Sequence, residues 1–255
     1  MNGLGIIRDS LHVRDMRNRN TVVSERGTYT PVKEGTVHVW STRYSTLDRY
    51  YPLLSALVSP EERLKAASFK KNVETRRFIL RHGLVRALLE QYTKEDPVKL
   101  SFIYGRSGKP DLGPEGKFPD IRFSLSRTDE MVCVGITQES EIGLDIVRIQ
   151  SHYSFSAIEH FLFRPEERQW IAQAVPDHRA LRFFRIWALK EALLKASGSD
   201  VRMMKEADVS GIMTDTFLDG IYTVNLRETD QKCFIHESGC GEGHHCALAV
   251  IPKIN

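Results

Sequence analysis

The chain repeats itself once, at an offset of 105 residues. Three short blocks of the first half return in the second half at that spacing: Pro60-Glu-Glu-Arg63 as Pro165-Glu-Glu-Arg168, Arg77-Phe78 as Arg182-Phe183, and Ala87-Leu-Leu89 as Ala192-Leu-Leu194. A repeat of this length has the size of a domain rather than of a solenoid unit. We therefore expect two similar lobes, residues 36–140 and 141–255, preceded by a loosely ordered extension at residues 1–35.

The two lobes are expected to be related by a pseudo-twofold axis, each with a small, largely antiparallel sheet packed against helices, which is an α+β fold class. Ser59-Pro60 is typical of a helix start, with serine as N-cap and proline at the first helical position. A longer helix is expected from Val73 to Tyr92. Strands are predicted at five places: residues 37–40, 100–104, 122–125, 131–137 and 141–146.

The composition, with 41% hydrophobic and 27% charged residues, is that of a soluble globular protein. No apolar run approaches the ~20 residues that a membrane-spanning helix needs, and residues 1–35 lack the apolar core of a signal peptide. The net charge of +3 is too small to indicate nucleic acid, but it suits a polyanionic ligand or an acidic partner. Four cysteines without a secretory segment favour a reducing cytoplasm and free thiols.

Residues 183–195 predict an amphipathic helix in which Trp187, Glu191 and Lys195 are four residues apart and share one face. A Glu–Lys pair at this spacing stabilises an exposed helix by about 0.2–0.5 kcal/mol and needs no function. The first copy of the repeat carries other residues at the two matching positions, Arg86 and Glu90. Helix stability alone therefore does not dictate the pair.

The predicted strand at residues 142–147 holds an acid, Asp145, among apolar residues. A carboxylate in such a place is costly unless it is paired or bound to a metal, and a backbone donor or an arginine would be the structural alternative. Gly143 lacks a side chain and is expected to leave space beside Asp145 for a ligand or metal. Asp145 and Glu191 together suit Mg²⁺, and Lys195 could then reach a phosphate oxygen.

Gly143-Leu144-Asp145, followed by Trp187-Ala-Leu-Lys-Glu191-Ala-Leu-Leu-Lys195, resembles the motif pair of the 4′-phosphopantetheinyl transferase superfamily. The likeness extends from about Val37 to Ile251 and is greatest to the surfactin-synthetase-activating type, a single chain of two pseudo-symmetric lobes. It implies the 4′-phosphopantetheinyl transferase fold. It also implies transfer of the phosphopantetheine arm of coenzyme A to a serine of an apo acyl or peptidyl carrier protein, with release of adenosine 3′,5′-bisphosphate.

The resemblance also assigns roles to individual residues. Asp145 and Glu191 would bind Mg²⁺ on the pyrophosphate, and Glu191 or a water it holds would take the proton from the incoming serine. Lys195 would neutralise charge on the α-phosphate, and Glu166 matches an acidic position near the metal water. Six positions match residues that bind coenzyme A in the family: Lys65, Arg77, Lys109, Ser126, Arg127 and Lys195.

Two positions depart from the family pattern. Arg127 stands where a histidine usually contacts the 3′-phosphate, and arginine is always charged and can bind phosphate bidentately. Val147 stands where a third acid is often found, which predicts a weaker or altered metal preference. The departures leave open a catalytically degenerate relative that binds coenzyme A or a similar nucleotide for regulation. A nucleic-acid-binding module is a further alternative, although no recognised motif supports it.

The C-terminal region is rich in potential metal ligands, namely His236, Cys240, His244, His245 and Cys246. Their spacing fits no standard zinc pattern, so a hairpin tip at residues 239–243 is the favoured interpretation and structural zinc a minor alternative. Cys133 and Cys233 are expected to be buried as small apolar residues. From all these features we expect the protein to be a cytoplasmic monomer that uses Mg²⁺ and coenzyme A. We expect it to act on a carrier protein and to bind neither nucleic acid nor membrane.

Overall fold

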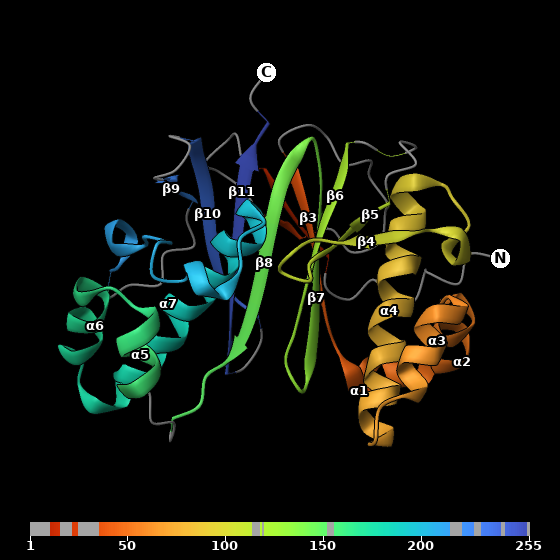
Figure 1. Ribbon diagram of the computed structural model, residues 1–255, viewed down its shortest axis with the longest axis horizontal. Helices are drawn as coiled ribbons and strands as arrows, with labels where there is room; N and C mark the ends of the chain where they lie inside the picture. The colour runs from red at the N-terminus through yellow and green to blue at the C-terminus, as the bar shows by residue number, and fades with distance from the viewer. Residues whose placement is uncertain are drawn as a thin grey trace.

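A computed structural model of the chain describes residues 11–15, 22–24, 36–113, 118, 120–151, 156–214, 221–226, 231–240 and 243–253. Two antiparallel sheets meet in the middle of the molecule, and helices cover the outer face of each (Figure 1). The predicted α+β fold class is confirmed. Within the described ranges, no helix is both long enough and apolar enough to cross a membrane.

The first sheet has five strands in the order β2-β1-β3-β7-β6, and all neighbours are antiparallel. Its strands are β1 (Leu11–Asp15), β2 (Val22–Ser24), β3 (Thr36–Arg43), β6 (Ile121–Arg127) and β7 (Met131–Gln138). β1 and β2 belong to the predicted extension at residues 1–35, and most of that extension lies outside the described residues. A separate two-stranded sheet pairs β4 (Phe102–Tyr104) with β5 (Pro110–Leu112).

Four helices accompany the first sheet: α1 (Tyr44–Leu47), α2 (Tyr51–Leu57), α3 (Pro60–Ala67) and α4 (Asn72–Thr93). α3 begins as predicted, because Ser59 Oγ accepts the Glu62 N–H at 3.2 Å while the Glu62 carboxylate accepts the Ser59 N–H at 2.9 Å. One face of α4 packs Leu84 and Leu88 against the sheet residue Phe123. Short 3₁₀ turns complete the chain: η3 (Asp48–Tyr50), η4 (Pro97–Lys99), η5 (Val201–Met203) and η6 (Ser210–Ile212).

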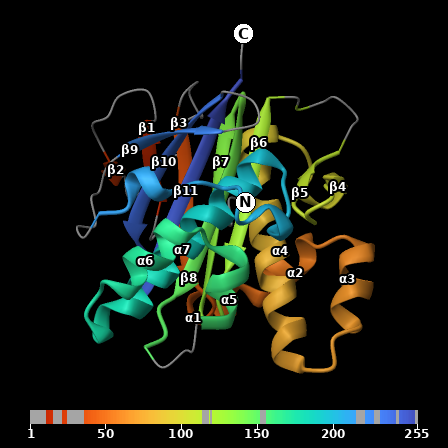
Figure 2. The ribbon, with the colours of Figure 1, turned by 60° about the vertical axis from the view of Figure 1, so that its left-hand side comes forward.

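The second sheet has four antiparallel strands in the order β8-β11-β10-β9. These strands are β8 (Ser140–Arg148), β9 (Ile221–Leu226), β10 (Gln231–Gly239) and β11 (His244–Pro252). Its helices are α5 (Ser156–Leu162), α6 (Pro165–Ala172) and α7 (Pro176–Ser197). Figure 2 shows α7 in front of the strands of this sheet, with α4 beside it on the other half of the molecule.

The sequence repeat has a counterpart in the helices. α3 and α6 each have eight residues and begin 105 positions apart, and α4 and α7 each have 22 residues. A buried acid anchors each pair, since Glu62 lies 2.7 Å from Arg86 Nε and Glu167 lies 2.8 Å from Lys190 Nζ. In each half, therefore, a buried ion pair joins a short helix to a long one, α3 to α4 and α6 to α7.

The inner faces of the two sheets share one apolar cluster. The first sheet contributes residues such as Val39 and Cys133, and the second contributes residues such as Leu144, Cys246 and Leu248. Side chains also join the facing edges of the sheets, because the Leu144 N–H of β8 donates to Ser124 Oγ of β6 at 3.0 Å. The packing brings β6, β8 and α7 together, which positions the site described next.

Candidate active site

Helix α7 lies directly against strand β8 at Gly143. A Cβ atom at this position would lie 1.9 Å from the carbonyl oxygen of Ala192 and 2.5 Å from the amide nitrogen of Ala196. The prediction that Gly143 leaves space for a ligand or metal is therefore wrong, because the backbone of α7 fills that space. Its missing side chain instead allows the close approach that brings the last turns of α7 to Asp145.

Asp145 is buried and is held by two donors at the same oxygen. Lys195 Nζ lies 2.6 Å and Ser126 Oγ 2.8 Å from Asp145 Oδ1. The Lys195 ammonium also donates to the Leu144 carbonyl at 3.1 Å, and Ser126 Oγ accepts the Ile146 N–H at 3.2 Å. The carboxylate is thus held by a lysine and a serine, rather than by the backbone donor or arginine considered from the sequence.

Glu191 lies half-buried beside this pair. Burial raises the pKa of its carboxyl above the ordinary value of 4.5, the Lys195 ammonium acts against that rise, and the Asp145 carboxylate adds to it. Among the described residues the Glu191 carboxylate forms no hydrogen bond or ion pair. Two neighbouring carboxylates, one without a direct partner, are the oxygen donors that Mg²⁺ takes in proteins, so the residues present fit the ion.

Lys109 lies along the same edge of β8 as Lys195. Its Nζ donates to the Ile142 carbonyl at 2.8 Å and lies 3.8 Å from the Glu141 carboxylate. Lys195 binds the carbonyl of Leu144, two residues further on. Carbonyls of alternate residues in a strand point the same way and are about 7 Å apart. Two ammonium groups therefore follow one edge of β8 towards Asp145.

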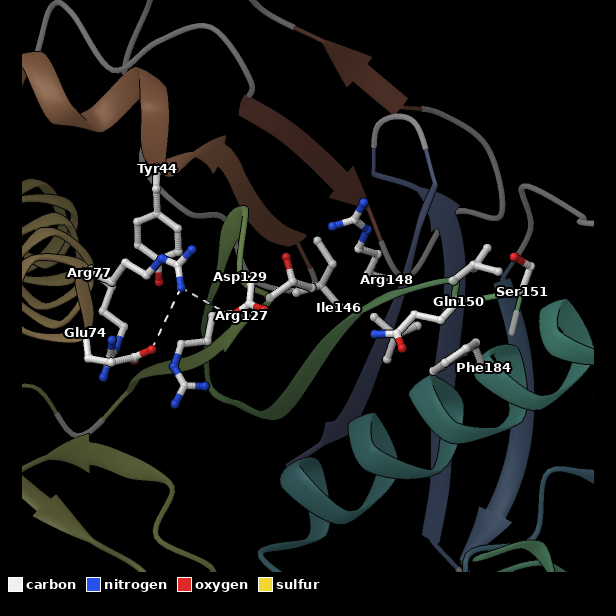
Figure 3. Close-up of a pocket in the computed structure, with 14 residues that line it drawn as sticks. Tyr44, Glu74, Arg77, Arg127, Asp129, Ile146, Arg148, Gln150, Ser151 and Phe184 are labelled. Carbon is white, nitrogen blue, oxygen red and sulfur yellow. Dashed lines mark hydrogen bonds and ion pairs between the residues drawn. The ribbon is translucent and has the colours of Figure 1, made fainter. Parts of the chain in front are cut away.

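A pocket of about 750 Å³ opens at the end of β8, where Ile146, Val147 and Arg148 line it (Figure 3). Its walls come from both halves of the chain, with Arg77 and Arg81 from α4, Arg127 at the end of β6, Val147 and Arg148 from β8, and Phe184 from α7. Figure 3 shows the α4 side chains on one side, and Ile146, Gln150 and Phe184 on the other. The β8 part of the pocket lining thus begins at Ile146, the residue that follows Asp145.

The arginines of the pocket differ in whether their charge is neutralised. Arg77 lies 3.3 Å from Asp129 and 3.9 Å from Glu74 (dashed lines in Figure 3), and Arg148 pairs with Glu130. In the described part of the chain, neither Arg81 nor Arg127 forms an ion pair with a carboxylate. Burial lowers the pKa of Arg81 and the nearby charge of Arg127 adds to this effect, while Tyr44 and the Glu74 carboxylate act against it. Two guanidinium groups that have no direct ion pair with a carboxylate, here called uncompensated, favour an anionic ligand in the pocket.

Part of this site lies in a stretch of the chain that resembles a known protein family. The model of the 4′-phosphopantetheinyl transferase superfamily matches residues 141–249 of the chain. This stretch includes β8 with Asp145 and α7 with Glu191 and Lys195. Residues 141–249 are thus similar to this superfamily. The relatives, which are named 4′-phosphopantetheinyl transferases, support an enzyme of this class.

Several relatives carry the same class name. The 4′-phosphopantetheinyl transferase HetI of Nostoc sp. is 27% identical over 175 residues, which are 68% of this chain and 73% of the relative. The 4′-phosphopantetheinyl transferase gsp of Aneurinibacillus migulanus is 27% identical over 80% of this chain and 81% of its own length. A 4′-phosphopantetheinyl transferase of Bacillus subtilis is 24% identical over 77% and 84%, respectively.

Most of the residues predicted from the superfamily pattern are brought to one region. Asp145, Ser126 and Lys195 are in direct contact, and Glu191 adjoins them. The others lie along β8 or in the pocket, namely Lys109, Arg77 and Arg127. Lys65 is exposed on α3, where its Nζ lies 5.9 Å and 5.8 Å from the ring centroids of Phe78 and Tyr104, and it does not line the pocket.

Two adjacent acids at the start of α6 have different surroundings. Glu166, the predicted catalytic acid, is exposed in the first turn. Glu167 is fully buried, accepts the Arg164 N–H at 2.8 Å, and pairs with Lys190. Because Lys190 directly precedes Glu191 in α7, the Glu167 pair fixes the helix at the level of the site. The role of Glu166 stays a prediction.

The sequence analysis did not predict two basic residues that line this pocket, Arg81 and Arg148. Arg81 follows Arg77 by four residues, so its helical face could have been recognised. Arg148 had no such signal, because a single charged residue at a strand end is ordinary.

Proposed function

We propose that this protein transfers the 4′-phosphopantetheine arm of coenzyme A to a serine of an apo acyl or peptidyl carrier protein. We further propose that the reaction requires Mg²⁺, releases adenosine 3′,5′-bisphosphate, and is carried out by a monomer in the cytoplasm. The observation that carries the proposal is the Asp145–Lys195–Ser126 cluster beside Glu191, next to a pocket with two uncompensated arginines.

The positive charges support a pose for coenzyme A. Arg81 and Arg127 suit the 3′-phosphate, because guanidinium groups bind phosphate oxygens in a bidentate manner. The ammonium groups of Lys195 and Lys109 follow the edge of β8 and suit the pyrophosphate. In this pose the adenosine end occupies the pocket and the bond to be broken lies beside Asp145.

The carboxylates of Asp145 and Glu191 are assigned to metal binding and proton transfer. Asp145 and Glu191 would hold Mg²⁺, which when bound neutralises the pyrophosphate and polarises the phosphorus. Glu191 accepts the proton of the carrier serine hydroxyl, directly or through a water, as its oxygen attacks that phosphorus. Lys195 stabilises the negative charge left on adenosine 3′,5′-bisphosphate as the bridging P–O bond breaks. Ser126 keeps Asp145 oriented.

The proposal is tested by mixing the purified protein, coenzyme A and Mg²⁺ with a panel of apo carrier proteins and measuring intact carrier mass. We expect at least one carrier to gain the mass of a single phosphopantetheine arm at its serine. No gain with any carrier, although coenzyme A binds tightly, would instead support the degenerate regulatory relative.

A further inference from the structure

Three of the four cysteines converge between the two sheets. Cys133 lies in β7 of the first sheet, Cys246 lies in β11 of the second, and Cys240 follows β10 in the hairpin to β11. Their sulfur atoms all lie within 4.8 Å of one another. Cys133 and Cys246 are buried and Cys240 is half-buried.

The surroundings of this three-cysteine cluster are apolar, with Leu144, Ile146 and Leu248 as neighbours in the inter-sheet core. Hydrogen bonds to Cys240 from Cys133, Cys246 and Ser238 hold the pKa of its thiol well below the ordinary range. Three sulfur atoms that converge from two sheets in an apolar core form a ligand set that one soft cation can bind.

We infer that Cys133, Cys240 and Cys246 form a three-thiolate site for one soft, thiophilic metal ion, Zn²⁺ or Cu(I). Sulfur atoms arranged around an ion at ~2.3 Å are separated by about 4 Å, so small side-chain movements close the present triangle. Sulfur ligands select soft cations and exclude Mg²⁺, which separates this site from the carboxylates.

Binding has a defined proton balance. Each cysteine thiol that is protonated releases its proton to solvent as its metal–sulfur bond forms, and all three sulfur atoms bind as thiolates. No electron is transferred. The ion would join β7 of one sheet to the β10–β11 hairpin of the other, beside the pairing of β11 with β8 (Ala247 with Asp145). Metal that binds only the folded chain raises its unfolding temperature.

The test uses untagged, fully reduced protein under anaerobic conditions, with Zn²⁺ and Cu(I) in separate titrations against a chromophoric competitor. Cd²⁺ serves as a spectroscopic probe, because the intensity of its ultraviolet charge-transfer band reports the number of thiolates. We expect one ion per chain, a band corresponding to three thiolates, and a higher unfolding temperature. Tight saturation by Zn²⁺, Cu(I), or both would identify the metal.

Variants separate the site from general thiol binding. Cys240→Ser and Cys246→Ser should weaken binding by more than about tenfold, the loss that even an outer-shell change can cause. The matched control is Cys233→Ser, because Cys233 is also fully buried in β10 but faces the core on the opposite side of the sheet. Since Cys240 is half-buried, its variant is expected to fold, which circular dichroism will verify.

Three outcomes would overturn the inference. These are no binding by the reduced wild-type protein, undiminished binding by Cys240→Ser, or equal loss of binding in Cys233→Ser. None of them affects the carrier-protein reaction, which depends on the carboxylates and can be measured separately with Mg²⁺ and no soft metal.

Discussion

Lys195 Nζ lies 2.6 Å from Asp145 Oδ1, joining the last turn of α7 to the middle of β8. The Lys195 side chain is 23% exposed while that of Asp145 is 9% exposed. The ammonium therefore neutralises a largely buried acid and still has a side open to solvent. Such a lysine can serve both as the structural partner of Asp145 and as a donor to a phosphate.

Replacing that ammonium should affect both roles. Lys195→Met keeps much of the side-chain length but leaves Asp145 with Ser126 alone, so the free energy of unfolding should fall by about 1–3 kcal/mol. The rate of transfer should fall by roughly 10²–10³-fold, as when a transition-state donor is removed. Chemical denaturation and steady-state kinetics measure the two effects. Lys205→Met, at an exposed lysine of the same half, is the control and should change neither.

Glu191 should show a conflict between activity and stability. Its raised folded pKa means that the folded state holds a proton at this carboxyl more tightly than the unfolded state does. Stability therefore rises as pH falls through the folded pKa, and Glu191→Gln should be more stable than wild type at neutral pH. The difference should disappear below the unfolded value of 4.5. Denaturation across pH in the presence of a chelator measures this.

The same substitution should remove proton transfer and lower the rate by about 10²–10⁴-fold. In the wild type, activity should decline on acidification at a pH above the ordinary glutamate range. A Glu191→Gln protein that is less stable than wild type at neutral pH would contradict the assigned burial, and one that is fully active would contradict the assigned role.

The two uncompensated arginines, Arg81 and Arg127, are expected to contact the 3′-phosphate of coenzyme A. Arg127→Gln and Arg81→Gln should raise KM for coenzyme A about 10–100-fold, corresponding to a lost charge-assisted hydrogen bond of about 1.5–3 kcal/mol. With 3′-dephospho-coenzyme A, the same variants should differ little from wild type. Arg202→Gln serves as control, since Arg202 is 86% exposed and pairs with Asp200. Equal penalties with both substrates would place the 3′-phosphate elsewhere.

The close approach of α7 to β8 can be tested at Gly143. Gly143→Ala forces a Cβ against the backbone of Ala192, which cannot move as a side chain end can. We expect a loss of about 1–3 kcal/mol or more in the free energy of unfolding, together with reduced activity as Glu191 and Lys195 shift. Gly211→Ala has open space around its Cβ and should lie within about 0.5 kcal/mol of wild type. A neutral Gly143→Ala would refute the packing.

Four of the helices and several strands could be predicted because their signals are local or repeated. The capping pattern at Ser59 and the 105-residue repeat are enough to predict α3, α4, α6 and α7. The motif around Glu191 and Lys195 likewise identifies the partners of Asp145. The capping pattern and the motif each lie within a short stretch of sequence, and the repeat is found by comparing two such stretches.

What the sequence could not reveal depends on the third dimension. Gly143 looked like an opening because nothing in the strand itself shows that α7 lies against it. The two acids of α6 look alike in sequence, yet only Glu167 points at Lys190. Cys133 lies over 100 residues from Cys240, so its place between the sheets follows only from how the two sheets pack.

The most direct test of the site's role is a single-turnover reaction in which holo-carrier and adenosine 3′,5′-bisphosphate are quantified together. Wild-type protein should form the two products in equal amounts with Mg²⁺ and neither with chelator. Asp145→Ala and Glu191→Ala should form neither product while still binding coenzyme A through the arginine pocket. Undiminished product formation by both folded variants would contradict the assignment of these carboxylates as the catalytic centre.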